Sequence, residues 1–156
     1  RGAGLKFDAP TMFVSECVLI YMRPEEGTSI IEWATSTFPV SLFLTYEQVH
    51  LHDPFGDVMV KNIAARGCPL LALQAYPDCN SQVERYLKAG WERCESLTMK
   101  DLDAKTAQDH PEEVQRVSRL EWLDEVEELH LIQNHYCITI ASQDGGSGML
   151  AKCSLK

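Results

Sequence analysis

Carboxylate and phenol side chains follow two apolar segments of the chain. Glu16 comes directly after "TMFVS", and Tyr46 and Glu47 follow "SLFLT". Both segments are typical of buried strands, and in open α/β sheets ligands bind beyond the carboxyl ends of the strands. A carboxylate there can accept a hydrogen bond from a hydroxyl or amino group of a ligand, and a tyrosine can donate one. We therefore select Glu16, Tyr21, Tyr46 and Glu47 as candidate site residues.

Each candidate also has a purely structural interpretation. Glu16 could bond only to the neighbouring loop or lie exposed at the rim of the sheet. Tyr21 and Tyr46 could be core aromatic residues whose hydroxyl groups are bonded inside the protein. The pattern of residues leaves both interpretations open.

The histidines do not predict a metal site. "HLHD" places His50 and His52 on one side of an extended segment, but Asp53 before Pro54 is typical of a helix N-cap. "EELH" has the Glu-x-x-His spacing of di-iron bundles, which need a second copy and further glutamates. We expect no metal, and the sequence contains neither a G-x-x-x-x-G-K-[ST] loop nor a G-x-S-x-G elbow.

The elements that would position the candidates alternate between strand and helix. We expect strands at 11–15, 41–49 and 135–143, a weak strand in "WERCESLTM", and helices at 24–38, from the Asp53 cap to Gly67, from a Ser81–Glu84 capping box to Gly90, and from Pro111 to a break near Asp124. This alternation predicts an α/β fold with a mostly parallel sheet and helices on both faces. A length of 156 residues fits one domain.

Composition limits the function classes. Fourteen Lys and Arg against 23 Asp and Glu give a formal charge of −9, which opposes binding to nucleic acid. No apolar run reaches the roughly 18 residues of a membrane span. The six cysteines contain no C-x-x-C pair, which favours a reducing, cytoplasmic setting. We expect a monomer, and the start at Arg1 without a signal peptide suggests a piece of a longer protein.

Five separated blocks resemble the leucine carboxyl methyltransferase family: "SECVLIYMRPEE", "YEQ", "DPFGDVMVKN", "LKAGW" and "LDEVEELHLIQNHYC". The resemblance covers about residues 10–142, with 143–156 as a tail. It implies the carboxyl-terminal half of a class I S-adenosylmethionine-dependent methyltransferase domain, carrying the fourth to seventh strands of a seven-stranded sheet. It also implies that Glu16 contacts the cofactor and that Tyr21 borders the pocket for a substrate carboxylate.

The resemblance leaves the substrate open between two branches of the family. One branch methylates the terminal leucine of the protein phosphatase 2A catalytic subunit, and we favour it because the chain is acidic. The other is a tRNA wybutosine-synthesising carboxyl methyltransferase. The family's glycine-rich cofactor loop and substrate-binding arginine are not in these residues, so we expect the chain alone to be inactive. A protein-binding module that uses the face of 53–66 is the non-enzymatic alternative.

Overall fold

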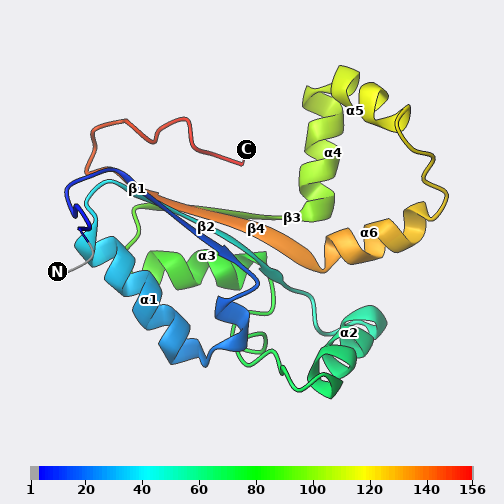
Figure 1. Ribbon diagram of the computed structural model, residues 1–156, viewed down its shortest axis with the longest axis horizontal. Helices are drawn as coiled ribbons and strands as arrows, with labels where there is room; N and C mark the ends of the chain where they lie inside the picture. Colours follow the sequence, from blue (N-terminus) through cyan, green and yellow to red (C-terminus); the bar gives the residue numbers. More distant parts are fainter. Residues whose placement is uncertain (1–3, 156) are drawn as a thin grey trace.

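The computed structural model describes residues 4–155, which form a four-stranded sheet with helices against it (Figure 1). Residues 1–3 and 156 of the expected domain lie outside the described part. The elements, in chain order, are β1 (Thr11–Glu16), the 3₁₀ turn η1 (Leu19–Tyr21), α1 (Pro24–Thr37), β2 (Ser41–Gln48), α2 (Pro54–Ala65), α3 (Cys79–Lys88), β3 (Arg93–Thr98), α4 (Met99–Asp109), α5 (Pro111–Ser118), α6 (Val126–Asn134) and β4 (Tyr136–Gln143).

The sheet has the order β1-β2-β4-β3 and is mixed. β1 and β2 are parallel and joined through α1, whereas β4 is antiparallel to both β2 and β3. The predicted α/β class and the mostly parallel sheet are confirmed, because β1, β2 and β3 run in the same direction and only β4, among the described strands, runs in the opposite one. β4 is reversed because the chain from β3 to β4 passes through α4, α5 and α6 and returns from the same end of the sheet (Figure 1).

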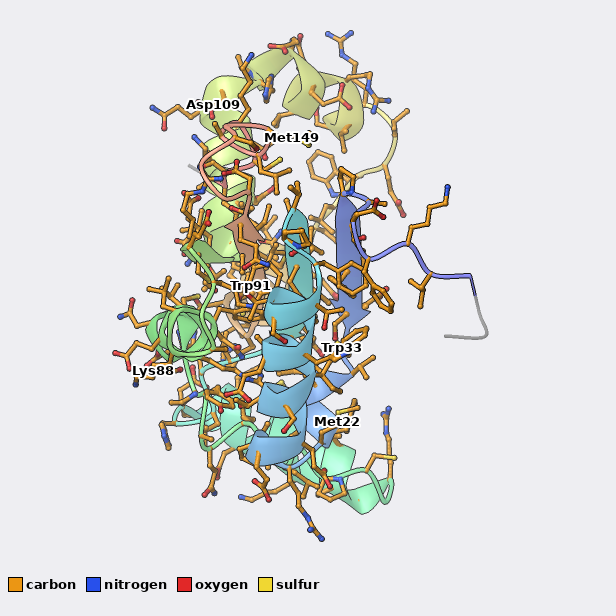
Figure 2. The ribbon with its side chains drawn as sticks, turned by 90° about the vertical axis from the view of Figure 1, so that its left-hand side faces the viewer. Met22, Trp33, Lys88, Trp91, Asp109 and Met149 are labelled. Carbon is orange, nitrogen blue, oxygen red and sulfur yellow. The ribbon has the colours of Figure 1, made fainter. Side chains whose placement is uncertain are left out.

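One face of the sheet carries the main core. α1 and α3 lie against this face (Figure 1), and the core joins Phe43 of β2 to Ile31 of α1 and Tyr86 of α3. Figure 2 shows Trp33 and Trp91 on opposite sides of α1. The Trp33 ring lies 6.0 Å from that of Phe13 on β1, and these contacts fix β1 and β2 against α1.

The opposite face of β1 is open. Met12 and Val14 are 60% and 65% exposed on that face, so the described helices do not cover β1 there. Over β1, the described residues therefore place helices on one face of the sheet. Within residues 4–155, β1 also has a neighbouring strand on one side only, which leaves its second edge unpaired. An apolar, half-paired strand of this kind is normally covered by another part of a protein.

Helix starts follow local capping chemistry. The predicted cap at Asp53 is confirmed, because its carboxylate accepts the Gly56 N–H at 2.7 Å. The predicted Ser81–Glu84 capping box is wrong: α3 begins earlier, with Asp78 as the cap and Ser81 as its reciprocal partner. Aspartate is as strong a cap as serine, so the first competent residue starts the helix.

The segment between β3 and β4 forms an arm away from the sheet (Figure 1). It contains α4, which the sequence reading missed although Thr98 and Asp101 form a capping box. The helix predicted from Pro111 ends at Ser118, earlier than the break expected near Asp124. Among residues 4–155, none of the helices combines the length and apolar character needed to cross a bilayer.

Candidate active site

The candidate site lies at the carboxyl ends of β1 and β2, which meet because these strands are parallel. Glu16 is the register partner of Tyr46, so both side chains leave the sheet on the open face that carries Met12 and Val14. Tyr136 is the register partner of Gln48, two residues beyond Tyr46 on the same face. The sheet therefore brings one carboxylate and two phenols together at the edge formed by the carboxyl ends of β1 and β2.

Tyr46 and Tyr136 stack on one another, with ring centroids 5.2 Å apart and planes at 16°. Burial raises the pKa of Tyr46 above its usual value, and the nearby Tyr136 and Cys17 raise this pKa further. The Tyr46 hydroxyl group is therefore neutral and able to donate a hydrogen bond at physiological pH.

Tyr21 reaches the same edge from the 3₁₀ turn η1 and is 37% exposed. Desolvation raises its pKa, with further contributions from Cys17, Cys68 and Tyr136, which are close enough to act on it electrostatically. Two of the predicted candidates thus present neutral hydroxyl groups near Tyr136. Tyr46 shares the open face of the sheet with Glu16, and the assignment of both tyrosines to a substrate pocket stays a prediction.

Glu16 is exposed at the last position of β1, and the chain turns sharply after it. Cys17 has a φ of 49°, in the left-handed region that non-glycine residues seldom occupy, and its N–H donates to the Tyr46 carbonyl oxygen at 2.8 Å. Such strained positions cluster at functional sites. Burial, followed by the charges of Glu47 and Glu16, raises the pKa of the Cys17 thiol, so this thiol is not an activated nucleophile.

Glu47 points away from the other candidates. Strand side chains alternate, so the residue after Tyr46 leaves the sheet on the covered face, where Glu47 is 1% exposed. Its Oε1 accepts the N–H of Ile20 at 2.8 Å. The assignment of Glu47 to a substrate pocket stays a prediction, and the position of its carboxylate inside the core does not favour that role.

Tyr136 and Cys17 belong to this edge but were not among the candidates. The alternating "HYCITIASQ" segment does place Tyr136 at a strand end, but an antiparallel return of β4 to the carboxyl ends of β1 and β2 was needed to bring it there. The left-handed turn at Cys17 has no sequence signal of the kind that a glycine gives.

Two cavities lie next to this edge, along the loop after β2. One of about 250 Å³ is lined by His50, His52, Asp53, Pro77 and Asp78, and one of about 520 Å³ by Leu51, His52, Asp53, Pro54 and Asp57. The residues of the described chain include no group of three or more His, Cys, Asp or Glu that could hold a metal ion. The His135 ring is instead enclosed, with Nε2 at 2.8 Å from Asp53 Oδ1 and Nδ1 at 2.7 Å from the Leu131 carbonyl oxygen.

This edge can bind a polar ligand by hydrogen bonds. Glu16 provides an acceptor, and Tyr21 and Tyr46 provide neutral donors beside apolar and aromatic surface. An exposed carboxylate of this kind suits the hydroxyl or amino groups of a cofactor, whereas the phenols suit an anionic group such as a carboxylate.

Comparisons with known proteins agree with this geometry. No family model matches the chain. The chain is 37% identical to "Leucine carboxyl methyltransferase 1 homolog" of Arabidopsis thaliana, over 91% of this chain and 42% of that protein. It is 38% identical to "tRNA wybutosine-synthesizing protein 4" of Homo sapiens, over 90% of this chain and 20% of that protein. The chain thus spans about two fifths of the length of the Arabidopsis relative.

A solved structure shares the fold. Haemonchus contortus phosphoethanolamine N-methyltransferase 2, in complex with S-adenosyl-L-methionine, superposes with a TM-score of 0.52 at 11% identity, over 85% of this chain and 33% of that one. At this identity the likeness concerns the fold alone. The expected methyltransferase fold is confirmed.

Proposed function

We propose that this chain, which belongs to the leucine carboxyl methyltransferase family, forms the carboxyl-terminal part of an S-adenosylmethionine-dependent carboxyl methyltransferase. The observation that supports this most is the position of Glu16. It ends β1 on the open face, beside the parallel strand β2, where open α/β sheets bind their ligands. The conserved fold of the solved methyltransferase supports the same assignment.

In this proposal Glu16 accepts hydrogen bonds from the cofactor and holds it beyond the end of β1. When bound, S-adenosylmethionine supplies a methyl group on a positively charged sulfur. A substrate carboxylate is ionised near neutral pH, so no side chain has to remove a proton from it. The work of the chain is to orient both groups and to exclude water. The hydroxyl groups of Tyr21 and Tyr46 would donate to the substrate carboxylate.

The substrate that we propose is the carboxyl-terminal leucine of the protein phosphatase 2A catalytic subunit, in the cytoplasm. The formal charge of −9 supports a protein over a polyanion, because like charges repel at long range. The second candidate is a tRNA wybutosine precursor, and it is kept because the human tRNA wybutosine-synthesizing protein 4 is 38% identical to the chain.

Calorimetric titration with S-adenosylhomocysteine tests the cofactor assignment. The titration is made on the chain and on a chimera in which this chain replaces the matching segment of the Arabidopsis relative. We expect saturable binding to the chimera and weak or no binding to the chain, because the open face and the unpaired edge of β1 need a further layer. A folded chimera that does not bind would contradict the proposal and favour a protein-binding module instead.

A further inference from the structure

Glu47 and Arg85 form a buried ion pair beneath the candidate site. The side chains of both are 1% exposed, and Glu47 Oε2 lies 3.9 Å from Arg85 Nη1. At that distance the two groups attract each other without a direct hydrogen bond. Burying both charges costs desolvation free energy, so the pair is a weak source of stability. Stability alone therefore does not explain its presence here.

The Glu47 carboxylate binds backbone amides of η1. Its Oε1 accepts the Ile20 N–H at 2.8 Å, across 27 positions of sequence, and the Leu19 amide also faces the carboxylate. These amides lie at the start of a short 3₁₀ turn. The side chain of its cap residue, Val18, makes no hydrogen bond to them. A carboxylate at the start of a helical turn also matches the direction of its backbone dipoles.

Arg85 is confined beside Glu47 by Tyr76 and by Gly27 of α1. Its guanidinium group lies 4.1 Å above the ring of Tyr76, and α1 approaches so closely that a Cβ on Gly27 would meet Arg85 Nη2 at 2.3 Å. Gly27 is therefore the small residue that makes room for the cation. The arginine keeps a positive charge next to the carboxylate that holds η1.

The segment held in this way connects the candidate site residues. Leu19 packs in the core cluster under α1 and α3, and Ile20 packs in a second cluster with Met59 of α2. Glu16 is four residues before Ile20, and Tyr21 is the next residue. Displacing the Ile20 amide would thus shift both ends of the segment that includes the strained Cys17.

We propose that Glu47 and Arg85 are positioning residues, which fix the backbone of 17–21 so that Glu16 and Tyr21 face the cofactor and substrate together. The effect on ligand binding rests on the proposed function. The effect on the backbone rests on the hydrogen bond from the Ile20 amide to Glu47. In this proposal both residues act on the cofactor through the backbone of 17–21 and not by direct contact. The ion pair behind the site therefore controls the affinity for cofactor by holding the backbone that carries Glu16.

Amide hydrogen exchange on the chain tests the structural part. Glu47→Ala should speed exchange of the Ile20 amide at least tenfold relative to core amides of β2, while Glu47→Gln, which keeps a carbonyl oxygen as acceptor, should largely restore protection. The matched control is Asp144→Ala, which removes another buried carboxylate that accepts backbone N–H groups and faces an arginine, Arg93. Equal acceleration of Ile20 exchange in Asp144→Ala would overturn the proposal.

Gly27→Ala tests the ion pair without altering either partner. The added Cβ should displace the guanidinium group and speed exchange of the Ile20 amide in the wild-type background, but not in an Arg85→Met background. The same acceleration in both backgrounds would contradict a role for Arg85.

Cofactor binding to the chimera tests the functional part. Glu47→Ala should raise the KM for S-adenosylmethionine about tenfold and change kcat little, and Glu47→Gln should recover most of the affinity. Failure of the unmodified chimera to bind would refute the proposed function and leave the exchange result standing. Unchanged KM in an active Glu47→Ala chimera would refute the positioning role alone.

Discussion

Glu16 and Tyr46 are register partners at the carboxyl end of the parallel pair β1 and β2, and their side chains share the open face of the sheet. A parallel pair is what brings the ends of two strands that are separated by a helix to one place. The proposed cofactor contact therefore depends on the crossover through α1, and the properties of Glu16 can be tested directly.

Glu16→Ala should weaken cofactor affinity in the chimera. The loss of a charge-assisted hydrogen bond costs about 1 to 3 kcal/mol, or roughly 5- to 150-fold in dissociation constant. Calorimetry with S-adenosylhomocysteine measures it. Glu32→Ala, an exposed carboxylate on α1, is the control and should bind normally. Equal affinities for the two variants would remove Glu16 from the site.

Glu47 should make stability depend on pH. Burial raises its pKa from 4.5 to about 7, against the opposing effects of the Ile20 amide and Arg85. Between these two pH values the folded protein keeps a proton on Glu47 that the unfolded chain has lost. The free energy of unfolding therefore falls as pH rises from 4.5 to 7, by at most about 3 kcal/mol, and the contribution of Glu47 is constant above pH 7.

Urea unfolding at pH 5 and pH 8 checks this dependence. Glu47→Gln cannot titrate, so its stability should change less between the two pH values than that of the wild type. Asp144→Asn is the control. The Leu150 N–H is the main cause that lowers the pKa of Asp144, so this carboxyl group titrates below pH 5 and does not contribute between pH 5 and pH 8. Parallel pH profiles for wild type and Glu47→Gln would show that Glu47 does not titrate there.

Asp53 should stabilise the start of α2 and the buried His135 together. Its Oδ1 accepts from Gly56 N–H and lies 2.8 Å from His135 Nε2. Asp53→Ala should cost about 1 to 2 kcal/mol from the cap alone, and more because a buried ring nitrogen loses its partner. Asp53→Asn keeps an oxygen and should cost less. Urea midpoints measure both, and an Asp53→Ala midpoint equal to the wild type would contradict the shared role.

Cys79 should be the more reactive of two partly buried thiols. A hydrogen bond from Cys137 lowers the pKa of Cys79, whereas burial raises the pKa of Cys94 to about 12. At pH 7.5 we expect iodoacetamide to alkylate Cys79 at least ten times faster than Cys94, because the thiolate is the nucleophile. Peptide mass spectrometry over time gives both rates. Similar rates, or a faster reaction at Cys94, would contradict the arrangement.

Strand ends could be predicted from sequence better than the sheet that joins them. The apolar run before Glu16 and the Asp53–Pro54 cap are local signals, and both features are present in the structure. The antiparallel return of β4 is a long-range pairing that no local pattern specifies, and it is what brings Tyr136 to the site.

The alternation of side chains along a strand could have separated Glu47 from Tyr46 at the level of sequence. Adjacent strand residues point to opposite faces, so Tyr46 and Glu47 could not both reach one pocket from a regular strand. The contact with the Ile20 amide, by contrast, depends on the turn at Cys17, where a non-glycine residue adopts a left-handed conformation. That turn is set by tertiary contacts and has no sequence signature.

Methyl transfer to a protein carboxyl terminus tests the central claim most directly. The chimera is incubated with labelled S-adenosylmethionine and, in parallel, with the protein phosphatase 2A catalytic subunit and with hypomodified tRNA. A catalytic subunit that lacks its terminal leucine is the control. We predict base-labile label on the intact subunit alone, as expected for a methyl ester. Label on the tRNA alone would contradict the proposed substrate, and a folded, cofactor-binding chimera that labels neither would contradict carboxyl methyl transfer itself.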